Sequence, residues 1–130
     1  MKRACNLDLE LLLKEDLFLL NEGALVEQFV AQELLASARI DELDGLFSWV
    51  REQVGSSAEI DFLLAQGAKL IPIEVKSGAI GSLRSLKIFL AEKKLPFGVR
   101  ISEQPLSFRE KILSVPFYLI EQMPRLLSRL

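Results

Sequence analysis

Residues 59–76 restrict the fold more than any other part of this 130-residue chain. Two alternating segments, 59–64 and 71–76, flank the turn residues 66–69, and Gly67 suits the first central position of a two-residue type II′ turn. Side chains at i and i+2 of a strand leave the same face of a sheet. The pattern therefore predicts an antiparallel hairpin with one apolar face.

The turn also predicts which residues face each other across the hairpin. Pairing Gln66 with Lys69 sets three apolar pairs: Leu64 with Ile71, Phe62 with Ile73, and Ile60 with Val75. We expect all of these apolar side chains on one face, because a slip by one residue would set apolar side chains against charged ones.

The other face of the predicted hairpin carries charge. The same register sets Asp61 opposite Glu74 and Glu59 opposite Lys76. Directly opposed like charges destabilise a sheet. The repulsion between Asp61 and Glu74 must therefore be offset by Lys76, by a divalent cation or by exposure to water. We expect Glu59 to be a solvated partner of Lys76.

The chain contains no histidine, and this excludes several kinds of site. Histidine-based catalytic triads, histidine-ligated zinc and the usual proton shuttle at neutral pH are all ruled out. The sequence also lacks the pattern G-x-x-x-x-G-K-[ST], so nucleotide hydrolysis by a P-loop is not expected. A metal site would have to use oxygen ligands, which favours Mg²⁺ or Mn²⁺.

We expect a single cytoplasmic domain over residues 1–130, with a helical lead-in over 1–20. Cys5 is the only cysteine, which predicts a free thiol in a reducing compartment. Acidic residues interrupt the N-terminal apolar stretch, so no signal peptide is expected. No apolar run reaches the ~18–20 residues of a membrane span, so no membrane partner is expected.

Charge is unevenly distributed along the chain. The first 65 residues hold 5 Lys or Arg and 13 Asp or Glu, a net charge of −8, whereas the last 65 hold 11 and 5, a net charge of +6. The basic half contains Arg84, Lys87, Lys93, Lys94, Arg100, Arg109 and Lys111. A local basic surface can attract phosphate backbones even on an acidic protein. The alternative for each of these residues is an ordinary solvated helix face.

In its first half the rest of the pattern predicts helices over 7–20 and 24–38 with a break at 21–23, a strand over 46–50, and a loop at 55–57. In its second half it predicts a flexible link over 77–82, a helix over 83–93 capped by Ser82, strands over 97–102 and 112–115, and a C-terminal helix over 116–127. Trp49 should be a core or strand-packing residue. Leu86, Phe89 and Leu90 should form the buried side of the helix over 83–93. Together with the hairpin, this order predicts an α/β fold with a mixed central sheet flanked by helices.

The helix predicted over 24–38 is apolar on most sides, so we expect it to be largely buried. Glu27 lies at the centre of its apolar stripe, which is formed by Ala24, Val30, Ala31 and Leu34. A carboxylate in such surroundings must be paired, protonated or bound to a metal.

These acidic and basic residues suggest one chemistry. Asp61 and Glu74 could hold one divalent cation, Lys76 could orient a water or stabilise charge on a phosphate, and Glu27 could position the metal or its waters. This set suits metal-assisted hydrolysis of a phosphodiester. A ladder of surface ion pairs is the alternative interpretation of the same residues.

Four segments of the sequence, 23–30, 48–49, 58–63 and 71–78, resemble a bacterial and archaeal family of uncharacterised domains. The resemblance covers roughly residues 18–122. Domains of that family usually follow an AAA-type ATPase module and a winged-helix-like segment. The family is similar to the PD-(D/E)xK nuclease superfamily. The resemblance therefore implies a restriction-endonuclease-like core, with Asp61, Glu74 and Lys76 as the signature and Glu27 as the helix acid.

Two functions follow from these observations. The first is an Mg²⁺- or Mn²⁺-dependent nuclease that acts on DNA or RNA. The second is a nuclease-like module that does not cut and that binds nucleic acid, an AAA-type ATPase or a second copy of itself. Half of the residues are hydrophobic, and residues 119–130 hold more apolar side chains than one helix face needs. These features predict an exposed apolar surface and a homodimer.

Overall fold

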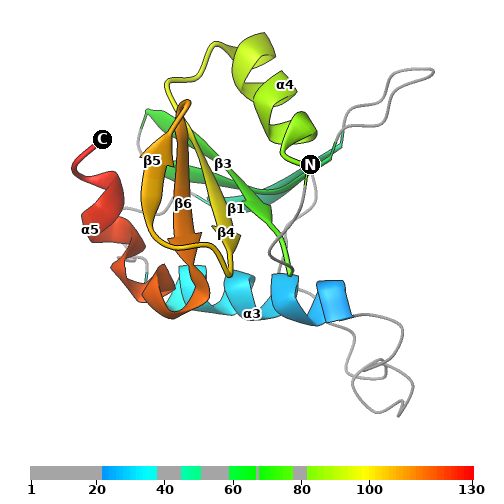
Figure 1. The fold of residues 1–130 in the computed structure, drawn as a ribbon, viewed down its shortest axis with the longest axis vertical. Helices are drawn as coiled ribbons and strands as arrows, with labels where there is room; N and C mark the ends of the chain where they lie inside the picture. The colour runs from blue at the N-terminus through cyan, green and yellow to red at the C-terminus, as the bar shows by residue number, and fades with distance from the viewer. Residues whose placement is uncertain (1–21, 38–44, 51–58, 67, 78–81) are drawn as a thin grey trace.

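The computed structural model describes residues 22–37, 45–50, 59–66, 68–77 and 82–130. These residues form a six-stranded mixed sheet of order β1-β2-β3-β4-β6-β5, flanked by helices (Figure 1). The strands are β1 (Gly45–Val50), β2 (Glu59–Gln66), β3 (Lys69–Val75), β4 (Gly98–Ser102), β5 (Ser107–Arg109) and β6 (Ile112–Pro116). The helices are α3 (Glu22–Ser37), α4 (Arg84–Lys93), the 3₁₀-helix η1 (Phe117–Gln122) and α5 (Met123–Leu127).

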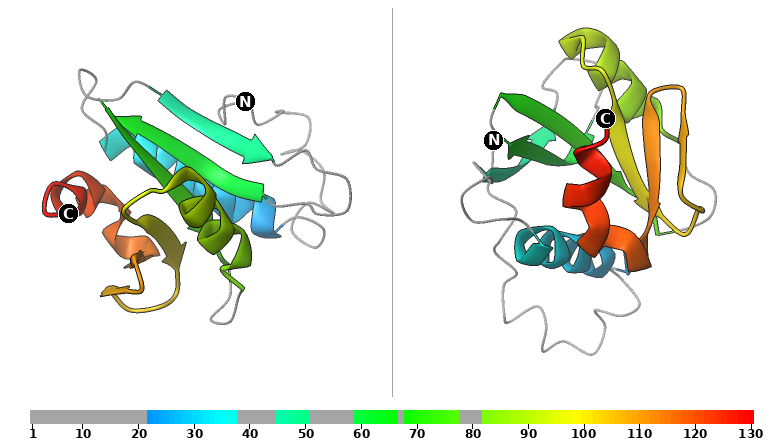
Figure 2. Two further views of the ribbon diagram at one scale, coloured as in Figure 1. Left: turned by 90° about the horizontal axis from the view of Figure 1, so that it is seen from above. Right: turned by 90° about the vertical axis from the view of Figure 1, so that its left-hand side faces the viewer.

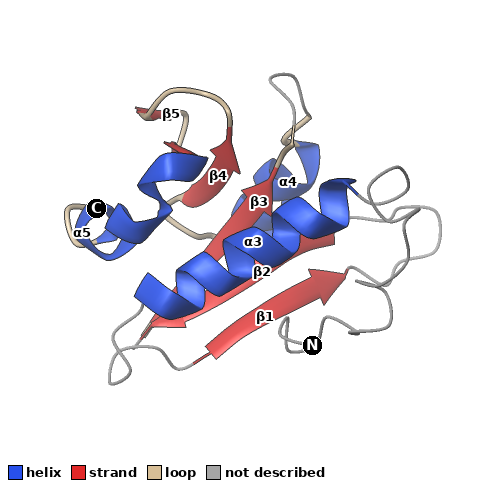
Figure 3. Cartoon of the chain, turned by 90° about the horizontal axis from the view of Figure 1, so that it is seen from below, coloured by secondary structure: helices blue, strands red, loops and turns tan. Residues whose placement is uncertain are grey.

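The predicted α/β architecture is confirmed. Strand β2 lies between β1 and β3 and is antiparallel to both, whereas β4 is parallel to both β3 and β6. Helix α4 makes the crossover between β3 and β4, and it packs against β2 and β3. Helix α3 covers the opposite face, where it also contacts η1 and α5 (Figures 2 and 3).

Each face of the sheet has its own apolar cluster. The larger cluster joins Val30, Ala31 and Leu34 of α3 to strand residues that include Ile73 and Val99. The smaller cluster joins Leu86, Phe89 and Leu90 of α4 to Ile60, Leu63 and Ile112. The predicted buried side of α4 is therefore confirmed.

The register predicted for the hairpin is confirmed near its turn. Gln66 pairs with Lys69, Leu64 with Ile71 and Phe62 with Ile73. The ladder between β2 and β3 ends with this last pair, so the pairings predicted for Glu59, Ile60 and Asp61 are not made. Instead, the backbone N–H of Val75 donates to Oδ2 of Asp61 at 2.7 Å.

A bulge in β2 explains why the predicted register fails there. Phe47 pairs with Leu63 and Trp49 pairs with Ile60, so two residues of β2, Asp61 and Phe62, lie opposite one residue of β1. The extra residue reverses the alternation of side chains. Ile60 consequently packs in the α4 cluster and Phe62 in the α3 cluster, so the expectation of a single apolar face was wrong for Ile60.

The helix predicted over 24–38 is present as α3, but it is less buried than expected. The helix begins at Glu22, so the expected break at 21–23 is wrong for Glu22 and Gly23. Phe29 is 46% exposed and Leu35 is 38% exposed, whereas Val30 is fully buried. The helix thus buries one side only, because it lies on the outside of the sheet rather than within it.

Helix α4 begins one residue later than predicted. The Ser82 hydroxyl accepts a hydrogen bond from the N–H of Arg84 at 3.2 Å, and Leu83 occupies the N-cap position. At the other end, Lys94 takes the left-handed conformation and the N–H of Leu95 donates to the carbonyl of Leu90 at 3.1 Å. This bond closes the helix before Pro96.

The C-terminal part differs most from expectation. β5 was not predicted, and the expected helix over 116–127 is instead the end of β6 followed by η1 and α5. Ile120, Met123 and Leu127 are buried against the core, so part of the apolar excess of this segment covers the sheet.

Several predicted features lie outside the described residues: the helix over 7–20, Asn21, the burial of the Trp49 side chain, the loop at 55–57, Gly67 and residues 78–81. Among the helices that the structure describes, none is long and apolar enough to cross a membrane.

Candidate functional site

The end of β3 is held from both sides by hydrogen bonds of its backbone. The N–H of Val75 donates to Asp61 Oδ2 at 2.7 Å, and the N–H of Lys76 donates to the carbonyl of Ile101 at 2.9 Å. Successive N–H groups of a strand point to opposite sides, so one bond reaches β2 and the other reaches β4. Glu74 and Lys76 are therefore carried on a backbone whose position is fixed.

Glu74 and Lys76 form an ion pair with a marked asymmetry. Lys76 Nζ lies 2.7 Å from Glu74 Oε1, and the Lys76 side chain is 31% exposed while that of Glu74 is 7% exposed. The second oxygen of Glu74, Oε2, is buried and has no hydrogen-bond partner among the residues that the structure describes. Leaving a buried charged acceptor unpaired is unfavourable, so this oxygen is suited to a cation or to a donor from another molecule.

Burial raises the pKa of both strand carboxyls. The pKa of Asp61 is raised by burial, against the opposing effects of the Val75 N–H and the Lys76 charge. The pKa of Glu74 is also raised by burial, while the ion pair with Lys76 opposes the rise and the charge of Asp61 adds to it. The raised pKa of each carboxyl means that the single lysine does not fully offset the cost of burying two negative charges here.

Glu27 belongs to the same electrostatic cluster, although it comes from α3. Burial raises its pKa to about 7, and the charges of Asp61, Glu74 and Glu59 add to the rise while Lys76 opposes it. The charges of Asp61, Glu74 and Lys76 thus reach Glu27, although α3 covers the face of the sheet opposite to Glu74 and the described structure shows no hydrogen bond or ion pair between Glu27 and the other three residues. The ion pair that the described residues show for Lys76 is with Glu74, so the predicted partnership between Lys76 and Glu59 is not made.

The strand carboxylates suit a hard divalent cation. The chemistry of the donor set is oxygen only, and Glu74 Oε2 is a buried acceptor in need of a partner. Over the part of the chain that the structure describes, no group of three or more acidic ligands is close enough to hold an ion. Among the described residues, Asp61 and Glu74 are the pair that could hold a cation, and two carboxylates would suit Mg²⁺, an ion that keeps several waters and takes substrate phosphates as ligands.

A row of polar side chains extends from Glu74 across the sheet. In the strand register Glu74 pairs with Arg100, Arg100 pairs with Ser114, and Ser114 pairs with Ser107. Residues paired across neighbouring strands share a face. The row thus crosses β3, β4, β6 and β5 on the face opposite α3, because Ile73 and Val99, which alternate with it, pack in the α3 cluster.

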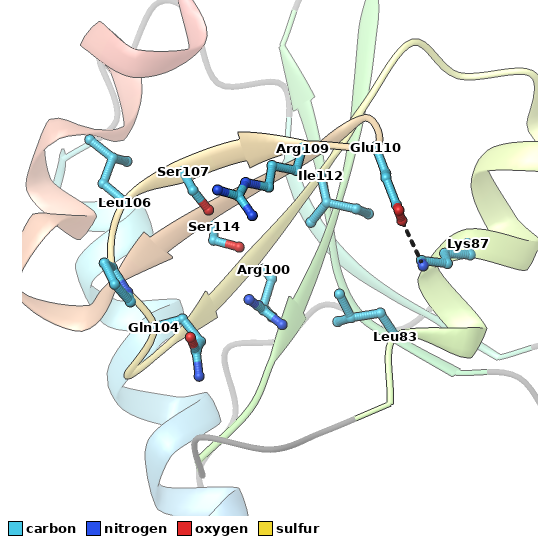
Figure 4. Close-up of a pocket in the computed structure, with 11 residues that line it drawn as sticks. Leu83, Lys87, Arg100, Gln104, Leu106, Ser107, Arg109, Glu110, Ile112 and Ser114 are labelled. Atoms are coloured by element: carbon cyan, nitrogen blue, oxygen red, sulfur yellow. Dashed lines mark hydrogen bonds and ion pairs between the residues drawn. The ribbon is translucent and has the colours of Figure 1, made fainter.

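The row leads into a hollow of about 590 Å³ beside β4 and β5 (Figure 4). Its polar lining consists of Lys87, Arg100, Gln104, Ser107, Arg109, Glu110 and Ser114. Arg100 Nε is buried without a hydrogen-bond partner in the described structure, whereas Lys87 Nζ pairs with Glu110 Oε2 at 3.1 Å. From the sequence, Arg100 is only one basic residue among seven. A charged residue between Val99 and Ile101, in a strand apolar on both sides, is the signal that singles it out.

The protein is thus a mixed α/β domain with a cluster of carboxylates and one lysine at the end of a central strand. Residues 22–119 match the family described as a domain of unknown function, DUF4143, and the chain belongs to that family. Glu27, Asp61, Glu74 and Lys76 all lie within the matched region. No curated protein and no solved structure gives a significant match.

Proposed function

We propose that this domain is a metal-dependent nuclease of the PD-(D/E)xK type that cuts phosphodiester bonds in DNA or RNA. The observation that carries the proposal is Glu74, which pairs with Lys76 through one oxygen and keeps the other buried and, within the described structure, unpaired. A restriction-endonuclease-like core is consistent with the order of elements, in which a helix and three antiparallel strands are followed by a crossover helix and a parallel strand.

Each residue of the cluster has a role in this proposal. Asp61 and Glu74 would hold Mg²⁺ or Mn²⁺, and a bound ion of this kind lowers the pKa of its water and screens the phosphate. Lys76 Nζ, anchored by Glu74 Oε1, is placed to stabilise negative charge on the phosphate. Glu27, with a pKa of about 7, can accept or release a proton near neutral pH.

A second function is a module that binds without cutting, and one observation favours it. α3 and η1 leave large apolar side chains exposed, with Phe29 46% and Tyr118 77% exposed. Such side chains would suit an AAA-type ATPase module or a second copy of this chain in the cytoplasm. The two functions differ in whether the cluster turns over substrate.

A nuclease assay separates the two functions. Labelled single-stranded and duplex DNA, and RNA, would be incubated with Mg²⁺, with Mn²⁺ or with EDTA. We expect cleavage with metal only, and a loss of about 10²-fold or more in Lys76→Ala, because Lys76 stabilises charge that develops in the reaction. Lys69→Ala, on an exposed residue of β3, is the matched control and should cut like the wild type. Metal-dependent cleavage that survives Lys76→Ala would contradict the proposal, and binding without cleavage would favour the second function.

A further inference from the structure

Two buried polar atoms on neighbouring strands lack hydrogen-bond partners among the described residues, and they have opposite chemistry. Glu74 Oε2 is an acceptor that suits a cation, whereas Arg100 Nε is a donor on a side chain that stays charged. Glu74 and Arg100 are register partners on β3 and β4, so their side chains leave the sheet next to each other. Even so, the described structure shows no ion pair between them. A guanidinium that a neighbouring carboxylate does not satisfy is available to an anion.

The hollow beside Arg100 supplies further groups that bind anions. In Figure 4 the side chains of Arg100 and Arg109 lie over the same hollow as the hydroxyls of Ser107 and Ser114. Among the described lining residues Glu110 is the only acidic one, and Lys87 pairs with it, so its charge does not compete for the two arginines. Arginine binds phosphate through two parallel N–H donors, which makes a pair of arginines with hydroxyls a suitable phosphate site.

The hollow also has the size and apolar content of a ligand site. Its volume of about 590 Å³ falls within the roughly 300–1,000 Å³ of typical small-molecule pockets. Leu83, Leu106 and Ile112 line it together with the polar groups. A phosphate with an attached sugar and base would therefore find both charged and apolar contacts here.

We propose that Arg100 and Arg109 form a phosphate subsite that holds the nucleic-acid backbone at a nucleotide next to the bond cut at Glu74 and Lys76. The subsite deepens the proposed function and rests on it for the identity of the substrate. The polar row gives the direction in which the nucleic-acid strand would run: from the carboxylates of β3, past Arg100 on β4, to Ser114 and Ser107 on β6 and β5.

Binding without cleavage tests the subsite. Fluorescence anisotropy of a labelled single-stranded oligonucleotide in EDTA would be measured for the wild type, Arg100→Gln and Arg109→Gln. We expect each variant to bind at least about tenfold more weakly, as befits the removal of a hydrogen bond between charged groups. The slope of log K against log salt should also fall by about 0.7 for each phosphate that a variant no longer neutralises. Arg125→Gln, on an exposed arginine of α5 outside the hollow, is the matched control and should bind like the wild type.

Oligonucleotides with a modified backbone test whether the phosphate is the group that Arg100 recognises. An oligonucleotide with neutral methylphosphonate linkages should bind equally to the wild type and to Arg100→Gln. Arg100→Lys should keep part of the affinity, because it keeps the charge but loses the paired donors. Thermal unfolding of each variant confirms that the fold is retained.

Three results would overturn the subsite: an equal loss in Arg100→Gln and Arg125→Gln, an unchanged affinity in Arg100→Gln, or a nucleoside monophosphate that competes as tightly as the oligonucleotide. Failure of the proposed function would give a different set of results from failure of the subsite. If the wild type cuts nothing yet binding depends on Arg100, the nuclease proposal fails and Arg100 stands as a phosphate-binding residue of a module that does not cut. If the wild type cuts and Arg100→Gln binds and cuts like it, the subsite fails and the nuclease proposal stands.

Discussion

The two faces of the central strands β3 and β4 are built from opposite chemistry. Toward α3 they present Ile73, Val75, Val99 and Ile101, all of them buried and apolar. On the other face the same strands place Glu74 and Arg100 side by side, each with a buried atom that lacks a partner in the described structure. Apolar burial stabilises a fold, whereas unsatisfied buried polar atoms destabilise it. The α3 face therefore contributes stability, whereas Glu74 and Arg100 reduce it, as expected if the polar face serves the binding function that we propose.

The largest expected effect is on the apolar face. Ile101→Ala removes a fully buried side chain from the α3 cluster and leaves a cavity, which should lower the free energy of unfolding by about 2–5 kcal/mol. Urea denaturation measures this change. Arg100→Ala, one residue away on the polar face, should lower the free energy of unfolding by much less. Equal losses in the two variants would contradict the difference that we infer between the two faces.

The next effect tests how closely α4 approaches β4. A Cβ added at Gly98 would lie 2.8 Å from Leu86 Cδ1 and 3.3 Å from Leu86 Cγ. Gly98→Ala should therefore lower the free energy of unfolding by about 1–3 kcal/mol through overpacking. Leu86→Val combined with Gly98→Ala should recover part of the loss, as measured by thermal unfolding. A fully tolerated Gly98→Ala would mean that α4 packs less tightly than the structure shows.

A smaller effect depends on pH and concerns Glu27. Its pKa rises from 4.5 to about 7 on folding, so the folded state holds the proton more tightly than the unfolded state. The stability linked to this proton is present in full below pH 4.5 and is lost as the pH rises toward 7. Glu27→Gln cannot titrate. The free energy of unfolding of this variant, relative to that of the wild type, should therefore be about 1 kcal/mol higher at alkaline pH than at acidic pH, after allowing for solvent screening of a half-buried group.

The comparison of unfolding free energies at pH 4 and pH 8 measures this gain, and Glu33→Gln on the same helix is the control. A difference between wild type and Glu27→Gln that does not vary with pH would show that Glu27 is not held among the other carboxylates.

Much of the fold follows from local patterns in the sequence. The turn predicted over 66–69 led to the register found from Gln66–Lys69 to Phe62–Ile73, and the spacing of Leu86, Phe89 and Leu90 predicted the buried side of α4. The bulge at Asp61 and Phe62 was missed because it arises from pairing with β1, a partner distant in the sequence. β5 was missed because three residues are too few to establish a strand pattern, and none of the three is buried.

The residues of the candidate site could be proposed from the sequence, but the polar row that extends from them could not. The i and i+2 spacing of Glu74 and Lys76 is visible in the sequence, and their ion pair follows from it. The position of Arg100 beside Glu74 could not be predicted, because it depends on the parallel pairing of β3 and β4, two strands that are separated in the sequence by the α4 crossover. The polar row therefore emerges only from the folded sheet.

Metal binding tests the central claim, namely that the polar face is a binding site centred on Glu74. Isothermal titration with Mn²⁺ would compare the wild type with Glu74→Gln and Asp61→Asn, and Glu103→Gln on an exposed residue after β4 is the matched control. We predict one site in the wild type and in the control, and at least about tenfold weaker binding in the two other variants. Equal binding in the wild type and Glu74→Gln, or no binding in the wild type, would contradict the account.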